Sequence, residues 1–293
     1  MDNFIVLYNP LAGNGTAQDK MRELESLMQG DRLYFSNMLD IRDYGAFFND
    51  MPDGASIIIC GGDGTLNRFL NDTEDIRPDC DIYYYPSGSG NDFARDIGAE
   101  RGAPPVLINR YIERLPKICV NGKEHRFING IGYGIDGYCC EKGDELRGKG
   151  NGEVNYTAIA IKGLLFHYKP TGATITVDGV EHRFEKVWLA PTMIGRYYGG
   201  GMMPTPEQDR LNGDGAVSVM VYYGSGKLKS LAVFPLIFKG EHIKHSEMVA
   251  VLSGRNITVC FDEPRPLQID GETVPGVREY SVTACEEKVL QPA

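Results

Sequence analysis

Residues 56–65, SIIICGGDGT, decide the fold of this chain. The apolar run at 56–60 is rich in β-branched side chains and indicates a short strand that is buried on both faces. The strand ends at Gly61-Gly62, and a helical stretch over residues 65–70 follows. A continuous apolar strand, a glycine turn and a helix are typical of one repeating unit of a parallel α/β sheet.

Two other segments in the first third of the chain repeat this order. Residues 4–8 (FIVLY) lead into NPLAGNG at 9–15 and a helical stretch over 16–28. Residues 81–85 (DIYYY) lead into PSGSG at 86–90 and then into the start of a helix, NDFAR. The carboxyl ends of parallel strands lie at one edge of the sheet, where such folds bind ligands. We therefore expect three glycine turns to converge at that edge.

The pattern changes at about residue 114 to short strands separated by hairpin signals. Asn121-Gly122 and Asp178-Gly179 are favoured two-residue turns, and Asp270-Gly271 has the same form. One helical stripe interrupts the strands, formed by Val154, Ala158, Ile161, Leu165 and Tyr168. We predict an α/β domain with a parallel sheet over 1–113, an antiparallel β-sandwich with an inserted helix over 114–285, and a short tail over 286–293.

Composition narrows the range of partners. The chain has 293 residues and a formal net charge of −10, with 42% hydrophobic and 24% charged residues. Such an acidic chain without a dense run of Lys and Arg argues against nucleic-acid binding, and any lipid contact has to be local and apolar. Seven cysteines without a CxxC pair, no signal sequence and no long apolar stretch predict a cytoplasmic protein with free thiols.

The GGDGT turn carries the clearest chemistry. Gly61 and Gly62 allow the backbone to bend so that amide groups face phosphate oxygens, and Thr65 opens a helix whose N-terminus favours anions. An aspartate among phosphates is repelled unless a cation lies between them, so Asp63 suggests Mg²⁺. The alternative is a plain turn that binds nothing. The turns at 9–15 and 86–92 carry the same alternative, in which Ser89 only caps a helix and Asp92 is only solvated.

These turns together resemble a known family. NPLAGNG, GGDGTLN and PSGSGNDFAR, in this order, are similar to the diacylglycerol kinase catalytic family, which includes bacterial diacylglycerol kinases and the sphingosine and ceramide kinases. FING (127–130), GGG (199–201), NGDG (212–215) and IDGE (269–272) also fit, so the resemblance spans nearly the whole chain. GGDGT alone also resembles NAD kinases and phosphofructokinases, whereas SGNDFAR points to lipid kinases.

The resemblance implies an NAD kinase- and diacylglycerol kinase-like nucleotide-binding domain, a C-terminal β-sandwich, and an ATP and Mg²⁺ site between them. Asp63 and Asp92 would organise the catalytic metal. Ser89 stands where the family usually has threonine, a change that keeps the hydroxyl. The residues implied to hold ATP are Asn9, Gly61, Gly62, Asp63, Gly64, Thr65, Asn67, Ser89 and Asn91.

Glu272 is implied to be the general base, because a lipid hydroxyl must lose its proton as it attacks the γ-phosphorus. The alternative is that residues 270–272 form only a hairpin turn. A second, structural Mg²⁺ is implied in the loop at 209–216, held by Asp214 and the carbonyls of Leu211 and Ala216. A surface turn is the alternative there.

One position departs from the family. Bacterial members often carry an aspartate in the strand that opens the second domain, and the match places Cys119 there. A neutral thiol cannot replace that charge. The site tolerates the loss, the match is shifted, or the protein is a weak or inactive relative.

The sequence therefore predicts an ATP-dependent lipid kinase that phosphorylates a hydroxyl of diacylglycerol or a related lipid. The alternatives are a soluble-substrate kinase of the NAD kinase type and a nucleotide-binding regulatory relative with weak catalysis. Expected partners are ATP, a lipid substrate and a membrane touched peripherally and transiently, with a homodimer left open. The segment YYGGGMM at 197–203 could line a lipid pocket, LAVFPLIF at 231–238 favours a core segment, and His242 and His245 favour a surface helix.

Overall fold

The computed structural model describes residues 2–11, 17–74, 76, 78–88, 90–148, 159–160 and 162–285. The chain forms two compact units, Met1–Glu113 and Arg114–Ala293. No helix in these described ranges is both long and apolar enough to span a membrane.

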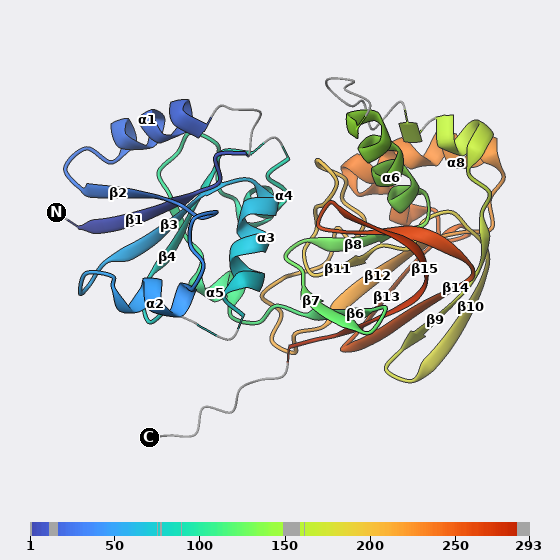
Figure 1. Ribbon diagram of the computed structural model, residues 1–293. Helices are drawn as coiled ribbons and strands as arrows, with labels where there is room; N and C mark the ends of the chain where they lie inside the picture. The colour runs from blue at the N-terminus through green and yellow to red at the C-terminus, as the bar shows by residue number, and fades with distance from the viewer. Residues whose placement is uncertain are drawn as a thin grey trace. The chain divides into compact units, whose positions relative to one another are not determined.

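The first unit is built on a five-stranded sheet with the strand order β2-β1-β3-β4-β5 (Figure 1). Strands β1 to β4 run parallel, and only the short β5 pairs in the antiparallel direction with β4. This confirms the expected parallel sheet and the expected neighbourhood of β1, β3 and β4. The strands are β1 Asn3–Tyr8, β2 Arg32–Asn37, β3 Ser56–Gly61, β4 Ile82–Pro86 and β5 Val106–Leu107.

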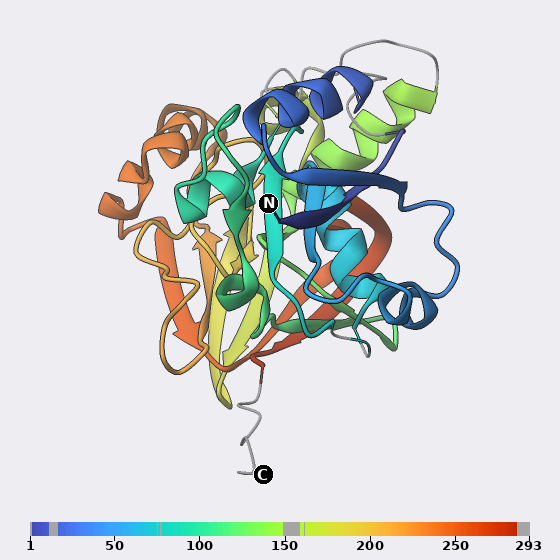
Figure 2. The ribbon, with the colours of Figure 1, turned by 90° about the vertical axis from the view of Figure 1, so that its left-hand side faces the viewer.

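The inner strands carry apolar side chains on both faces of the sheet, and helices cover both faces. Figure 2, in which the first unit faces the viewer, shows α1 on one side and α2 and α3 on the other. Leu24 of α1 packs with Phe4, Val6 and Ile58, and the ring of Tyr44 on α2 lies 5.8 Å from that of Phe69 on α3. The helices are α1 Ala17–Leu27, α2 Tyr44–Asn49, α3 Asp63–Asp72, α4 Asp92–Ile97 and α5 Asn109–Ile112.

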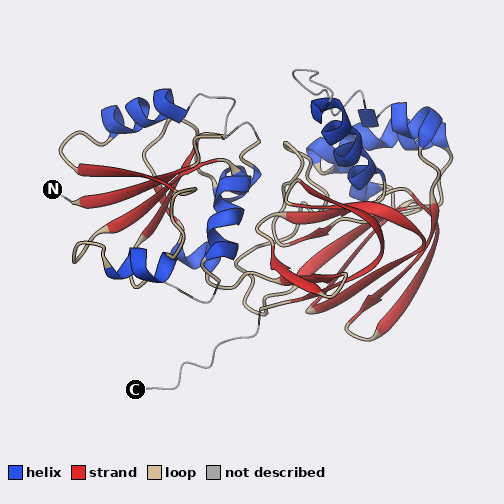
Figure 3. Ribbon diagram, viewed as in Figure 1, coloured by secondary structure: helices blue, strands red, loops and turns tan. Residues whose placement is uncertain are grey.

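The second unit is a β-sandwich of antiparallel strands, as expected, with its helices gathered on one side (Figure 3). Its strands are β6 Lys117–Val120, β7 Lys123–Arg126, β8 Gly130–Tyr133, β9 Thr171–Val177, β10 Val180–Val187, β11 Thr192–Met193, β12 Val217–Tyr222, β13 Val249–Gly254, β14 Asn256–Ile269 and β15 Glu272–Thr283. Its helices are α6 Ile135–Gly148, η2 Gly163–His167, α8 Lys227–Val233, η3 Phe234–Lys239 and η4 Glu241–Lys244.

The long strand β14 joins the two layers of the sandwich. Its first half pairs with β9 and its last three residues pair with β8. The change of partner coincides with register shifts between Cys260 and Leu267, where Pro264 and Pro266 interrupt the ladder. Inside, the rings of Tyr133 and Phe261 stack with centroids 4.1 Å apart, which packs β8 against the first half of β14.

The predicted helical stripe can be compared with the structure only near its end. Residues 154, 158 and 161 lie outside the described residues, whereas residues 159–160 and 162 are helical, η2 includes position 165, and Tyr168 lies just beyond η2. Helix α6 was not predicted, because it carries Gly137, Gly143 and two cysteines and therefore has weak intrinsic helix propensity. Packing holds this helix in place, because a Cβ at Gly137 would lie 1.9 Å from the carbonyl oxygen of Pro266.

Candidate active site

Two of the three glycine turns meet backbone to backbone. Strands β3 and β4 stay paired to their last residues, and the amide of Ser87 donates to the carbonyl of Gly61 at 2.9 Å. A Cβ built on Gly88 would lie 2.5 Å from the Cα of Gly62, and one built on Gly62 would lie 3.1 Å from the Cα of Gly88. Glycine at both positions lets the turns touch, and together these turns form what we call the strand-end cradle.

The carboxylate of Asp63 ties the two turns together. Its Oδ2 accepts a hydrogen bond from the amide of Asp92 at 2.9 Å, and its Oδ1 accepts one from the amide of Phe93 at 3.0 Å. Asp63 is also the first residue of α3, which begins two residues earlier than predicted. The carboxylate of Asp63 therefore lies at the N-termini of both α3 and α4, where negative charge is favoured.

A second carboxylate points to the same place. Asp92 is only 4% exposed, and its Oδ1 lies 3.8 Å from Nη1 of Arg95. A Cβ built on Gly90 would lie 3.5 Å from Oδ2 of Asp63 and 3.9 Å from Oδ2 of Asp92, so both carboxylates converge beside this glycine. Oxygen donors of this kind fit Mg²⁺. No group of three His, Cys, Asp or Glu side chains able to hold a metal occurs in the described part of the chain, so other oxygens would complete the coordination.

Two buried polar atoms beside the carboxylates lack a hydrogen-bond partner among the described residues. They are Oδ1 of Asn91 and the hydroxyl of Tyr84. Asn91 has a φ of 51° and donates through Nδ2 to the carbonyl of Gly88 at 2.8 Å. Burial raises the pKa of Tyr84 well above its usual range, and the charges of Asp63, Cys60 and Asp92 add to the shift. Tyr84 therefore stays a neutral hydroxyl under the site.

The other residues implied to bind ATP lie around the cradle in different ways. Thr65 is 4% exposed and packs beneath Gly61, whereas Gly64 is exposed in the first turn of α3. Asn67 accepts a hydrogen bond from Asn71 through its side-chain oxygen. Asn9 closes its own turn by accepting from the amide of Leu11 at 3.0 Å. Ser89 and the glycines at 13 and 15 lie outside the described residues.

In the second unit, Glu272 is an exposed side chain on a braced turn. Asp270 and Gly271 both have positive φ, 45° and 97°, so they form the tight hairpin between β14 and β15. The carboxylate of Asp270 accepts hydrogen bonds from the amides of Ile128, Asn129 and Gly130 at 2.6, 2.9 and 3.0 Å. The turn that carries Glu272 is therefore fixed to the segment before β8.

Two family profiles match the chain in the order of its two units. Residues 3–117 match the diacylglycerol kinase catalytic domain, and residues 129–286 match the YegS C-terminal NAD kinase beta sandwich-like domain. The second match alone covers more than half of the chain.

The chain belongs to the diacylglycerol kinase catalytic-domain family. It is 27% identical over 246 residues to a diacylglycerol kinase of Mycobacterium tuberculosis, a match covering 81% of this chain and 77% of that one. It is 29% identical over 224 residues to a diacylglycerol kinase of Bacillus subtilis, covering 74% and 70%. A crystal structure of a diacylglycerol kinase from Bacillus anthracis shares its fold, with a TM-score of 0.62 at 20% identity, over 97% of this chain and 94% of that one.

The loop implied to hold a second metal in this family is closed by internal hydrogen bonds. The carbonyl of Ala216 already accepts from Nε2 of Gln208 at 2.9 Å and from Nδ2 of Asn212 at 2.8 Å. Asp214 accepts from the amide of Ala216 at 3.3 Å. The carbonyl of Ala216 therefore already accepts two hydrogen bonds, and a second Mg²⁺ held by Asp214 and the carbonyls of Leu211 and Ala216 stays a prediction.

Cys119 lies on β6 opposite Ser281 of β15 and is partly exposed. Its neighbours Ile118 and Val120 are buried, so the thiol points to the other face of the strand.

The segment at 197–203 forms a closed loop, in which Tyr198 and Met202 exchange two backbone hydrogen bonds and are both buried. His242 lies in the short helix η4, as predicted, but the prediction that it lies at the surface is wrong. This side chain is fully buried and bonds the carbonyl of Pro204 at 2.9 Å.

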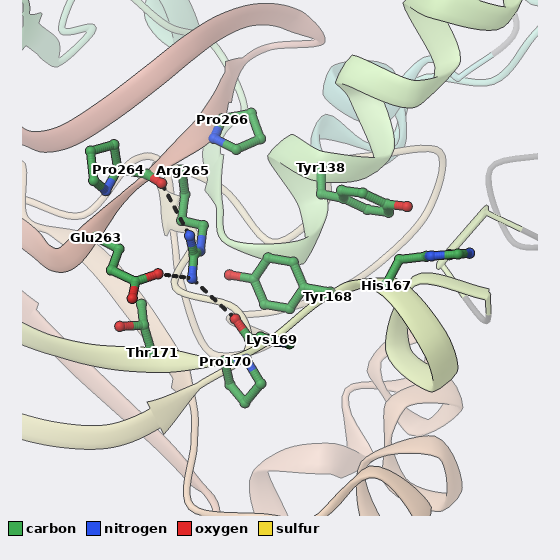
Figure 4. A pocket seen from close by; sticks show the side chains of 10 residues that line it. All are labelled: Tyr138, His167, Tyr168, Lys169, Pro170, Thr171, Glu263, Pro264, Arg265 and Pro266. Carbon is green, nitrogen blue, oxygen red and sulfur yellow. Dashed lines mark hydrogen bonds and ion pairs between the residues drawn. The ribbon is translucent and has the colours of Figure 1, made fainter.

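A hollow of about 480 Å³ lies within the second unit (Figure 4). Arg265 lies at its wall and donates to the carboxylate of Glu263 at 2.8 Å and to the carbonyl of Lys169 at 3.3 Å. Its guanidinium also lies 5.8 Å from the ring centroid of Tyr168. The charge of Arg265 is neutralised by Glu263, so we interpret this arginine as a brace for the irregular part of β14.

Sequence reasoning missed two side chains beneath the Glu272 turn, Asp136 and Gln268. They are joined at 2.9 Å although 132 residues separate them in the chain. Asp136 lies in GYGIDG, between two glycines, and its position among glycines was the only available signal.

Proposed function

We propose that this protein is an ATP-dependent lipid kinase, which uses Mg²⁺ and phosphorylates a hydroxyl of diacylglycerol or a related lipid. The observation that carries the proposal is the strand-end cradle, where two glycine turns touch and two carboxylates converge beside Gly90. Such a site suits a triphosphate with a bound cation, because backbone amides face the phosphates while carboxylates favour the ion.

In this proposal the chain supplies positioning and a base. Backbone amides at the start of α3 and around Gly88 would hold phosphate oxygens. Mg²⁺, held by Asp63 and Asp92, would neutralise charge on the transferred phosphoryl group. Glu272 would accept the proton of the acceptor hydroxyl, because it is an exposed carboxylate next to a turn that Asp270 fixes by three hydrogen bonds.

The names of the relatives support a lipid as the acceptor.

Transfer of labelled γ-phosphate tests the proposal. The full chain is incubated with Mg²⁺ and labelled ATP over a total lipid extract, purified diacylglycerol, NAD and simple sugars, beside Glu272→Gln. We expect label in a lipid for the unaltered chain and a loss of about a hundredfold or more in Glu272→Gln, because general-base catalysis contributes that much. Label in NAD or sugar alone would instead select the soluble-substrate kinase.

A lipid substrate requires contact with a membrane, and we propose where it occurs. Helices η2 and α8 pack together and expose Phe166 and Leu228, which are 72% and 81% exposed. Lys162, which immediately precedes η2, and Lys227, the first residue of α8, are exposed as well. Apolar side chains beside lysines suit the surface of an anionic bilayer even on a chain with net charge −10.

Sedimentation with phosphatidylglycerol-containing vesicles tests this contact. We expect Phe166→Ser with Leu228→Ser to reduce the bound fraction severalfold. Leu11→Ser, which changes a residue 79% exposed in the first unit, serves as the control and should bind like the unaltered chain. Equal binding by the double variant and the control would remove η2 and α8 from consideration.

The specific alternative is a nucleotide-binding relative with weak catalysis, and it is motivated by Cys119. If the missing charge limits turnover, Cys119→Asp should raise the rate of labelled transfer while leaving ATP affinity unchanged. Cys119→Ser keeps a neutral side chain of similar size and is the matched control. A rate that stays the same in Cys119→Asp shows that the charge is dispensable here.

A further inference from the structure

Gln268 connects the turn of Glu272 to helix α6. This side chain is 3% exposed on β14, and its Nε2 donates to Oδ2 of Asp136 at 2.9 Å. Its Oε1 accepts the amide hydrogen of Gly271 at 2.6 Å. One side-chain amide thus spans the distance from a carboxylate on α6 to the backbone immediately before Glu272.

Gly132 on β8 provides the space for this pair. A Cβ at Gly132 would lie 1.6 Å from Oδ2 of Asp136 and 2.7 Å from Nε2 of Gln268. Both distances are far below any real contact, so Asp136 and Gln268 occupy the volume that a side chain at 132 would need. Strand β8, helix α6 and strand β14 are therefore shaped around one another at this point.

The carboxylate also decides which way the glutamine points. A carboxylate only accepts hydrogen bonds, so it requires the NH₂ end of Gln268 and turns the carbonyl end toward Gly271. Burial raises the pKa of Asp136 to about 6, and hydrogen bonding from Gln268 and the Tyr198 hydroxyl opposes this shift. At neutral pH the group is ionised and the orientation of the amide is fixed.

Glu272 is held on both sides. Gly271, before it, is bonded through Gln268 to Asp136 on α6. Thr273, after it, donates through Oγ1 to Oδ2 of Asp144 on the same helix at 2.7 Å. Helix α6 therefore contacts the residues that flank Glu272 on each side.

We propose that Asp136 and Gln268 are positioning residues for Glu272, and this rests on the proposed function in which Glu272 is the base. They set the backbone from which the carboxylate projects, and a misplacement of about 1 Å in such a group can cost about a hundredfold in rate.

Gln268→Leu removes both hydrogen bonds with little change in volume. We expect kcat for the lipid to fall by about tenfold to a hundredfold, with KM for ATP unchanged, because the cradle is untouched. Asp178→Ala is the matched control, since Asp178-Gly179 is a hairpin of the same type whose carboxylate bonds the amides of Arg255 and Asn256. An equal loss of kcat in the control would overturn the positioning role.

The dependence of activity on pH in Gln268→Glu distinguishes a positioning role from a purely structural one. At low pH a proton shared between the new carboxyl and Asp136 restores the bridge, and at higher pH two carboxylates repel each other. We expect activity close to that of the unaltered chain near pH 6, falling towards pH 8 only in this variant. Tyr198 and Cys139 are titratable groups that face Asp136, and burial raises the pKa of the Cys139 thiol above its usual range.

Amide hydrogen exchange separates this proposal from the proposed function. If the unaltered chain labels no lipid, the lipid-kinase proposal fails, and exchange over residues 269–275 still tests the bridge. Faster exchange there in Gln268→Leu and in Gly132→Ala, without change at 176–182, supports the bridge. Exchange that matches the unaltered chain in both variants overturns it. Should Gln268→Leu not fold, Gly132→Ala and the pH profile of Gln268→Glu carry the test.

Discussion

Asp63 illustrates how one side chain can combine a structural and a chemical role. The sequence predicts that Asp63 helps to hold ATP and organises the catalytic metal. The structure adds that both of its oxygens accept amide hydrogens at the start of α4. Its position is therefore fixed before any ligand arrives, which is the condition for a preorganised site.

Replacing Asp63 should therefore affect both phosphate transfer and the stability of the fold. We expect Asp63→Ala to abolish labelled phosphate transfer and to lower the free energy of unfolding by about 1 kcal/mol, the usual effect of losing a helix cap. Asp43→Ala is the matched control, because Asp43 caps α2 through the amide of Ala46 at 3.0 Å. Urea unfolding and the transfer assay on both variants check this. Full activity in Asp63→Ala would remove the metal role.

His242 should make stability depend on pH. Burial lowers the pKa of His242, and its Nδ1 has no hydrogen-bond partner among the described residues. The unfolded chain therefore binds a proton more readily than the folded one below about pH 6.5, so stability falls as the pH falls through that value. In His242→Gln the fall of Tm with falling pH should disappear. In His125→Gln, which changes an exposed histidine, it should remain. An unchanged slope in His242→Gln contradicts the assignment.

Asp136 should act in the opposite direction. Burial raises its pKa from 3.8 to about 6, so the folded state binds the proton more readily and stability declines as pH rises from about 4 to 6. Above about pH 6 the loss of folding stability caused by the ionised Asp136 is constant. In Asp136→Asn this declining component should vanish, so Tm at pH 7 relative to pH 4 should be higher than in the unaltered chain. Thermal melts across that window measure it.

Among the elements, the hairpins were the most predictable. Asn121-Gly122, Asp178-Gly179 and Asp270-Gly271 all show the paired positive φ that their sequences favour. Local chemistry determines such turns, so their sequence suffices. Strand β2 (RLYFSN) and helix α6 escaped prediction, because the first is half-exposed with mixed polarity and the second contains glycines.

Two of these hairpins also allow a comparison of structure with function. Asp270 bonds three amides and Asp178 bonds two, both across a turn. We expect Asp270→Ala and Asp178→Ala to destabilise the chain by a similar amount, about 1 to 3 kcal/mol, since each leaves amides without an acceptor. Only Asp270→Ala should also slow lipid phosphorylation, because its turn carries Glu272. Equal rates of lipid phosphorylation in the two variants would show that the Asp270-Gly271 turn does not contribute to catalysis.

At the scale of the whole molecule, topology allowed the cradle to be predicted. Once β1, β3 and β4 are parallel neighbours, their carboxyl ends must share one edge. The link between Asp136 and Gln268 could not be predicted in this way, because it joins a helix without a clear pattern to a strand 132 residues away. Only tertiary packing brings such groups together.

Ligand binding should be visible in the full chain. If the cradle holds ATP with Mg²⁺, a ligand present at about a hundred times its Kd should stabilise the fold by about 2.7 kcal/mol. We expect Tm to rise with ATP and Mg²⁺ together, to rise less with ATP and EDTA, and not to respond in Asp63→Ala. A shift in Asp63→Ala equal to that of the unaltered chain would locate the nucleotide elsewhere.

The contact between Gly62 and Gly88 has a consequence for how this protein can change over time. A Cβ at Gly88 would clash with the Cα of Gly62 at 2.5 Å, whereas a Cβ at Gly62 would lie 3.1 Å from the Cα of Gly88, which requires that turn to shift by only a few tenths of an ångström. A saturation library should therefore find position 88 restricted to glycine and position 62 open to alanine at most.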